Sequence, residues 1–149
     1  MSSLFTSGHF VTLVTLLDGL LAGLFIGSSM VEHGARAFTP SVYIPYKHAK
    51  EAVFGPVMPV AFNLCLVLTA IAAFVTPSHL TFGVAAALMT LVMTITITIH
   101  LPLNKTFQSW SPDVYPVTWK EGRARWRNWN LVRAAFVIAA FGLVLVGQV

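Results

Sequence analysis

Four apolar stretches of bilayer length constrain this chain more than any other feature of its sequence. They cover residues 10–31, 53–75, 80–101 and 129–148. A helix needs about 20 mostly apolar residues to cross the hydrocarbon core of a bilayer. Charged residues make up only 9% of the chain, against about 25% in an ordinary soluble domain. The sequence therefore predicts an all-α fold, a four-helix transmembrane bundle that forms a single integral membrane domain over residues 1–149.

The connections between these stretches differ in length and in charge. Residues 76–79 make a short turn, whereas residues 32–52 and 102–128 form two long connections on the opposite side. Eight of the nine Lys and Arg residues lie in the two long connections, and the ninth is Arg133. Lys and Arg are enriched on the cytoplasmic side of membrane proteins. We therefore expect both termini outside and the long connections in the cytoplasm, in the plasma (inner) membrane. Basic residues interleaved with Trp beside a span suit lipid headgroups, so no nucleic acid partner is expected.

The fourth helix is expected to begin in water before it enters the membrane. Thr118, followed three residues later by Glu121, is a capping-box signature for the start of a helix. At about 100° per residue, one stripe of this helix carries Trp119, Trp126, Asn130 and Arg133. Arg123 is expected to face water or lipid headgroups instead.

Asp18 lies in the middle of the first apolar stretch. A carboxylate at that depth costs at least about 2.5 kcal/mol if nothing compensates it, so it should face the bundle and be protonated or paired. Candidate hydrogen-bond partners are Asn63, Thr90, Thr94 and Thr98. Two interpretations stay open for Asp18, a buried structural hydrogen bond and a functional role in proton handling or substrate binding.

The first stretch also carries Gly19, Gly23 and Gly27 at four-residue spacing. Small residues at that spacing let a second helix approach closely in a membrane. The stripe predicts helix packing, either within the chain or in a homo-oligomer.

Polar residues from distant parts of the chain are expected at one depth, near the inner ends of the helices. Such residues are rare in membranes and usually face the bundle interior or a cavity. The sequence therefore predicts a pocket at the inner ends of the first, third and fourth helices. Its candidate members are Glu32, His33, His48, His100, Asn104, Trp126, Asn130 and Arg133. Within it, Glu32 and Arg133 are expected to form an ion pair.

Four prolines lie in or just after the first long connection, namely Pro40, Pro45, Pro56 and Pro59. They predict an irregular, compact loop, and Pro56 and Pro59 also weaken the start of the second helix. Tyr43, Tyr46 and Phe54 then either cover the pocket mouth or anchor the chain at the membrane interface.

A metal-binding interpretation uses the histidines at the inner end. His33, His48 and His100, with Glu32, are ligand types that suit iron, copper or zinc, and haem would need only one or two of the histidines. No pair has a diagnostic ligand spacing, so an interfacial hydrogen bond remains the alternative for each. The cofactor is therefore open between none, a metal ion and haem.

Two short motifs resemble the anthrone oxygenase-like family of small four-helix membrane proteins. They are His100-Leu101-Pro102-Leu103-Asn104 and Trp126-Arg127-Asn128-Trp129-Asn130-Leu131-Val132-Arg133. The resemblance in layout covers nearly the whole chain. Fungal members of the family are associated with the oxidation of anthrones to anthraquinones. By resemblance, Asn104, Trp126, Asn130 and Arg133 match the motif positions.

The resemblance implies a membrane-embedded oxidoreductase, an oxygenase acting on a hydrophobic, anthrone- or quinone-like aromatic substrate. Deprotonation beside a carbonyl needs a base and a group that stabilises the oxyanion. The base is expected to be His100 or Glu32, and the stabilisers Arg133 with Asn104 or Asn130, while Trp126 stacks on the substrate. Two alternatives stay open, a metal- or haem-binding membrane protein and a non-catalytic subunit of a larger complex.

Overall fold

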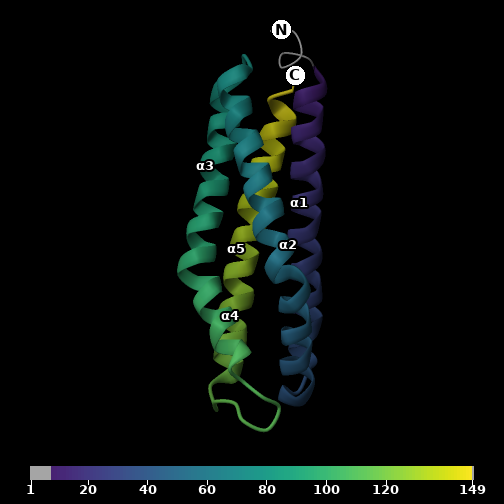
Figure 1. Cartoon of the computed structure of the whole chain (residues 1–149), viewed down its shortest axis with the longest axis vertical. Helices are drawn as coiled ribbons and strands as arrows, with labels where there is room; N and C mark the ends of the chain where they lie inside the picture. The colour runs from purple at the N-terminus through teal and green to yellow at the C-terminus, as the bar shows by residue number, and fades with distance from the viewer. Residues whose placement is uncertain (1–7, 149) are drawn as a thin grey trace.

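The computed structural model describes residues 8–148, and they form an all-helical bundle (Figure 1). Its elements are α1 (Gly8–Gly34), the 3-10 turn η1 (Ala35–Ala37), α2 (Pro40–Val75), α3 (His79–Ile95), the π-helical turn η2 (Thr96–His100), α4 (Leu101–Gln108) and α5 (Trp119–Val146). Because α3, η2 and α4 follow one another without a break, they make one long unit. The four resulting units are each long and apolar enough to span a membrane. The predicted fold class is confirmed.

The two ends of the bundle carry different connections. The start of α1, the end of α5 and the turn between α2 and α3 lie at one end, and residues 35–39 and 109–118 lie at the other (Figure 1). A hydrogen bond from Gln148 Nε2, two residues after α5, to Thr15 Oγ1 of α1 joins the two segments at the first end. This order of connections agrees with the predicted one. The side of the membrane that each end faces stays a prediction.

The first long connection is much shorter than predicted. Only residues 35–39 separate α1 from α2, and the prediction of an irregular loop over residues 32–52 is wrong. Pro40 occupies the first turn of α2, where a missing N–H costs nothing. Pro45, Pro56 and Pro59 lie inside α2, which changes direction near the middle of the bundle (Figure 1). Helices in membranes tolerate such prolines because neighbouring helices, side chains and local adjustments satisfy the freed carbonyls.

The third unit is helical through its alternating residues 93–99, but it does not end near Leu101 as predicted. At η2 the helix widens by one residue, and Leu101 N–H donates to Thr96 O. Pro102 follows in the first turn of α4, and the helix continues to Gln108. A π-turn of this kind is rare and occurs frequently at functional sites. It places Thr96 and His100 on the wall of the bundle interior.

Helix α5 begins at Trp119 as predicted, although the Thr118 side chain makes no capping hydrogen bond. Trp119, Trp126 and Asn130 are buried on the predicted stripe. The prediction that Arg123 faces water is wrong, since it is only 9% exposed and donates to Ala35 O and Phe38 O at 3.2 Å each. Ala35 O also accepts a backbone hydrogen bond from Phe38 N–H at 3.1 Å, so Arg123 adds a second donor at the connection after α1 and holds it against α5.

The glycine stripe of α1 packs in part against the chain itself. A Cβ atom on Gly19 would lie 3.1 Å from the Phe141 ring of α5, whereas one on Gly23 or Gly27 would meet nothing within 4 Å. Gly19 therefore serves close packing of α1 on α5. A homo-oligomer through the stripe stays a prediction.

This difference gives a matched pair of variants. Gly19→Val is expected to lower the free energy of unfolding by about 1–3 kcal/mol, because overpacking displaces Phe141. Gly23→Val should change it by less than about 0.5 kcal/mol, as is usual at open sites. Thermal unfolding in detergent micelles measures both, and equal losses in the two variants would contradict this packing role of Gly19.

Candidate functional site

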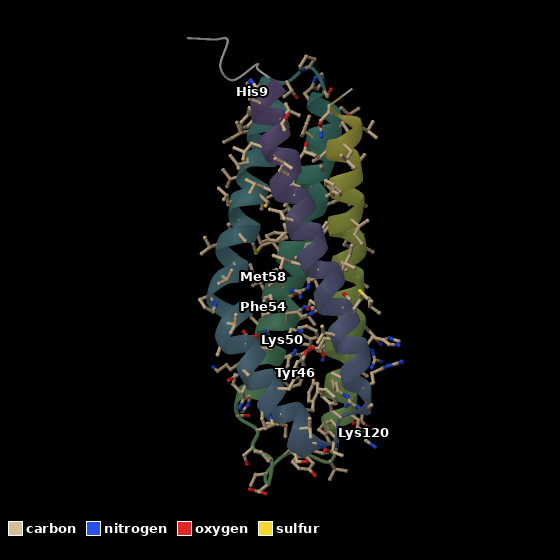
Figure 2. The ribbon with its side chains drawn as sticks, turned by 90° about the vertical axis from the view of Figure 1, so that its right-hand side faces the viewer. His9, Tyr46, Lys50, Phe54, Met58 and Lys120 are labelled. Carbon is tan, nitrogen blue, oxygen red and sulfur yellow. The ribbon has the colours of Figure 1, made fainter. Side chains whose placement is uncertain are left out.

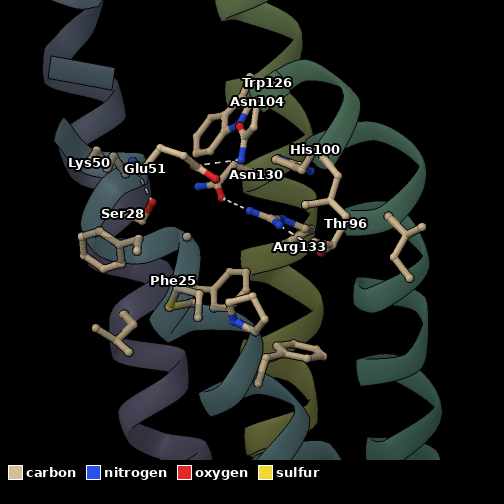
Figure 3. A pocket seen from close by; sticks show the side chains of 18 of the residues that line it. Phe25, Ser28, Lys50, Glu51, Thr96, His100, Asn104, Trp126, Asn130 and Arg133 are labelled. Carbon is tan, nitrogen blue, oxygen red and sulfur yellow. Dashed lines mark hydrogen bonds between the residues drawn. The ribbon is translucent and has the colours of Figure 1, made fainter. Parts of the chain in front are cut away.

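A pocket of about 190 Å³ lies inside the bundle, between α1, α2, the α3–η2–α4 unit and α5 (Figure 3). Its polar lining residues are Ser28, Lys47, Lys50, Glu51, Thr96, His100, Asn104, Trp126, Asn130 and Arg133. Most of its remaining wall is aliphatic, aromatic or methionine. The pocket joins a dense polar cluster to an apolar chamber.

One wall of the pocket is held together by Arg133 on α5. Arg133 Nη1 donates to Thr96 Oγ1 at 3.0 Å, and Nη2 donates to Asn130 Oδ1 at 2.8 Å (Figure 3). Asn130 Nδ2 donates in turn to Ser29 Oγ at 2.9 Å. The buried Arg133 Nε has no hydrogen-bond partner among the described residues. The Nε–H of Arg133 is therefore an unused donor, and neither side-chain partner of Arg133 carries a charge.

A second chain of hydrogen bonds connects α5, α4 and α2. Trp126 Nε1 donates to Asn104 Oδ1 at 2.7 Å, and Asn104 Nδ2 donates to Glu51 Oε2 at 3.0 Å. Both functional atoms of Asn104 are thus used within the protein. Asn104 fixes the positions of Trp126 and Glu51.

Two lysines of α2 share one carboxylate at the back of the pocket. Glu32 is 1% exposed, and its Oε1 accepts hydrogen bonds from Lys50 Nζ at 2.8 Å, Tyr46 Oη at 3.2 Å and Lys47 Nζ at 3.4 Å. Lys47 Nζ also lies 3.1 Å from the centroid of the Trp126 ring. The predicted pair of Glu32 with Arg133 is wrong, because the helical form of residues 40–52 brings the two lysines to Glu32 first.

His100 lies on the π-turn with its ring in the pocket wall. It is 1% exposed, and its ring lies edge-on to Trp126 at 5.1 Å between centroids. The carbonyl groups of Ile95 and Trp126 lie near the ring, but neither ring nitrogen completes a hydrogen bond within the described chain. A buried imidazole with unused nitrogens is unusual, since buried polar atoms are normally paired. Its nitrogens are therefore available to a molecule in the pocket.

The apolar part of the pocket reaches the surface that a bilayer would surround. Leu24, Phe54, Ile97 and Leu101 line the pocket and are also exposed on the outside of the bundle. Figure 2 shows Tyr46, Lys50, Phe54 and Met58 one above another along α2. An engineered cavity of about 150 Å³ takes up benzene, so a pocket of this size has room for an aromatic ring.

The structure brings most of the predicted site residues together. His100, Asn104, Trp126, Asn130 and Arg133 all line the pocket, and Glu32 lies directly behind it on Lys47 and Lys50.

Asp18 lies away from the pocket, in the apolar core. Its Oδ2 accepts a hydrogen bond from Thr69 Oγ1 at 2.8 Å, and Cys65 is close by. None of the predicted partners is used, because Asn63, Thr90, Thr94 and Thr98 all bond to carbonyls of their own helices. This environment favours the interpretation of Asp18 as a buried structural hydrogen bond.

The candidate metal ligands are spread apart. His33 is exposed beside Arg36, and His48 bonds to Phe107 O at 2.9 Å, while His100 lines the pocket. Within residues 8–148, no group of three or more His, Cys, Asp and Glu side chains could hold a metal ion. The predicted set of His33, His48, His100 and Glu32 is therefore not assembled at one place.

Three charged pocket residues were missed from the sequence, namely Lys47, Lys50 and Glu51. They were assigned to a loop, yet residues 43, 47, 50, 54 and 58 repeat at three- and four-residue spacing, which is typical of one helix face. That periodicity would have extended the second helix and placed the lysines in the pocket.

The family comparison agrees with this geometry. The family model described as anthrone oxygenase matches residues 45–143, which include almost all of the pocket. Comparisons with curated proteins and with solved structures found no match. The match covers well over half of the 149 residues and contains His100, Asn104, Trp126, Asn130 and Arg133. The chain belongs to the anthrone oxygenase family.

Proposed function

We propose that this membrane protein is an oxygenase that oxidises an apolar aromatic ketone of the anthrone type with dioxygen, in the pocket between its four helical units. The observation that carries the proposal is the pairing of an apolar chamber with His100 and Arg133, two buried groups whose nitrogens are not fully used. Family membership supports the same reaction class.

The chemistry needs a base and an anion-stabilising donor. An anthrone has an acidic CH₂ group whose deprotonation places negative charge on the ketone oxygen. His100 accepts that proton at a free ring nitrogen, and the Arg133 guanidinium donates to the resulting oxyanion through Nε–H. Phe25, Phe54 and Phe62 pack against the rings. Lys47 already occupies one face of the Trp126 ring, so Trp126 serves mainly to shape the pocket.

The overall reaction balances with dioxygen as the sole oxidant. The CH₂ carbon loses two hydrogens and gains one oxygen atom as a carbonyl, and the second oxygen atom leaves with the two hydrogens as water. One dioxygen is consumed for each anthrone that becomes an anthraquinone. The alternatives of a metal- or haem-binding protein and of an accessory subunit stay predictions.

Turnover by the purified protein in lipid nanodiscs tests the proposal. With anthrone as the substrate, we expect dioxygen uptake and anthraquinone formation in equal amounts, faster than in protein-free nanodiscs. A rate no higher than that background would contradict the proposed function.

Arg133→Gln is expected to lower kcat by about 10²-fold, near the lower end for loss of an oxyanion donor, because Lys47 and Lys50 keep positive charge in the pocket. Lys120→Gln, which changes an exposed residue of the same helix, serves as the control and should retain full turnover. An Arg133→Gln variant that folds and keeps wild-type kcat would remove Arg133 from the mechanism.

A further inference from the structure

A second hollow lies on the outer face of the bundle, between α1 and α5, which lie side by side in Figure 2. It is an open groove of about 520 Å³ whose walls include Ile26, Met30 and His33 of α1 and Leu131, Ala135 and Ile138 of α5. The eight residues from Ile26 to His33 span seven helical rises, so the groove is about 10 Å long, parallel to the helices. Its position and apolar walls suit an extended hydrocarbon chain.

The groove is separate from the pocket described above. Ser29, which also lines the groove, accepts a hydrogen bond from Asn130 of the pocket wall. The Ser29 hydroxyl is itself satisfied by Phe25 O at 2.8 Å. The groove therefore lies behind the pocket without opening into it.

Each wall of the groove is followed by an arginine, at the end of the bundle that carries most of the Lys and Arg residues. In η1, directly after α1, Arg36 donates from Nε to His33 O at 3.0 Å and contacts His33 Nε2 through Nη2. On α5, Arg127 lies one helical turn before Leu131 on the same stripe. Throughout residues 8–148, the lysine and arginine ion pairs all use Glu32. Arg36 and Arg127 thus have no carboxylate partner in the described chain.

An apolar groove with two unpaired arginines at one end matches a molecule that has a hydrocarbon chain and an anionic head. We propose that this groove binds one anionic phospholipid, with its phosphate on Arg36 and Arg127 and an acyl chain between α1 and α5. Guanidinium groups suit phosphate because they donate in pairs. A second copy of this chain is disfavoured, because in the same membrane orientation it would bring its own arginines to the same depth.

Lipid binding to the full-length protein in detergent tests this site by native mass spectrometry. The two probes are phosphatidylglycerol and phosphatidylcholine with identical acyl chains. We expect one phosphatidylglycerol per chain, bound about tenfold more tightly than phosphatidylcholine. The double variant Arg36→Gln/Arg127→Gln should lose this preference, and Arg125→Gln, which changes an exposed arginine of the same helix, should keep it.

A second variant tests the acyl-chain groove without changing charge. Ala135→Phe fills the groove and should weaken both lipids, whereas Ala87→Phe on the exposed face of α3 should weaken neither. Equal affinity of the wild-type protein for the two lipids would overturn the proposal. Unchanged phosphatidylglycerol binding in a folded double variant would also overturn it, as would a dimer that excludes lipid from the groove.

Discussion

Replacing His100 by phenylalanine is expected to lower kcat for anthrone oxidation by about 10²–10⁴-fold, the usual contribution of a positioned general base. Phenylalanine keeps a flat ring against Trp126 but has no nitrogen to take up the proton. Because His100 makes no hydrogen bond within the described chain, its replacement leaves no protein group unpaired. The protein should therefore fold normally and bind substrate with little change.

The measurement combines dioxygen uptake with substrate binding in nanodiscs. His79→Phe, which changes an exposed histidine at the opposite end of the bundle, is the matched control and should keep wild-type turnover. His100→Phe should separate kcat from binding, with the dissociation constant for anthrone within about threefold of the wild type. Full turnover by folded His100→Phe protein would mean that another group acts as the base, and the pocket carboxylate of Glu51 would be the next candidate to test.

Much of the fold follows from the sequence because the bilayer restricts the choices. Backbone groups in hydrocarbon must be paired internally, so an apolar stretch of sufficient length has to become a helix, including the alternating residues 93–99. The stripe that contains Trp126 and Asn130 followed from helical periodicity alone, and both residues are buried. The convergence of His100 and Arg133 on one pocket was predictable because polar side chains inside a membrane usually face the bundle interior.

The α1–α2 connection was not predictable by the same reasoning. Prolines signal loops in water-soluble proteins, but Pro45, Pro56 and Pro59 lie inside a helix here. The mistaken loop turned Lys47 and Lys50 into expected cytoplasmic charges, although both line the pocket. It also produced the wrong partner for Glu32, because an ion pair depends on which cation the backbone brings nearest.

The π-turn at η2 was not predicted from the sequence either. The sequence of Thr96–His100 is typical of an ordinary helix before Pro102. The extra residue in the turn depends on packing across the whole bundle, since it sets which side chains face inward. His100 was selected for its chemistry, but the absence of protein partners for its nitrogens required coordinates.

The cluster around Glu32 gives the largest expected effect on stability. Glu32→Gln removes the negative charge shared by Lys47 and Lys50, whose side chains are 3% and 12% exposed. Breaking a buried ion pair by removing one partner typically costs about 3–5 kcal/mol, because the remaining charge is left uncompensated. With two lysines depending on Glu32, we expect a loss in this range, measured as a lower apparent Tm in detergent by scanning fluorimetry.

A compensated variant separates the loss of charge balance from the loss of shape. Replacing all three groups by apolar side chains, as Glu32→Leu/Lys47→Met/Lys50→Met, removes the buried charges together and should restore most of the lost stability, because buried ion pairs often contribute little relative to packed apolar groups. Glu121→Gln, at an exposed position of α5, should change the free energy of unfolding by less than about 0.5 kcal/mol. If Glu32→Gln were as stable as Glu121→Gln, the lysines would have to be neutral or hydrated, and the charged cluster behind the pocket would not exist. If the triple variant were no more stable than Glu32→Gln, the contribution of Glu32 would lie in its hydrogen bonds, including the one from Tyr46, instead of in its charge.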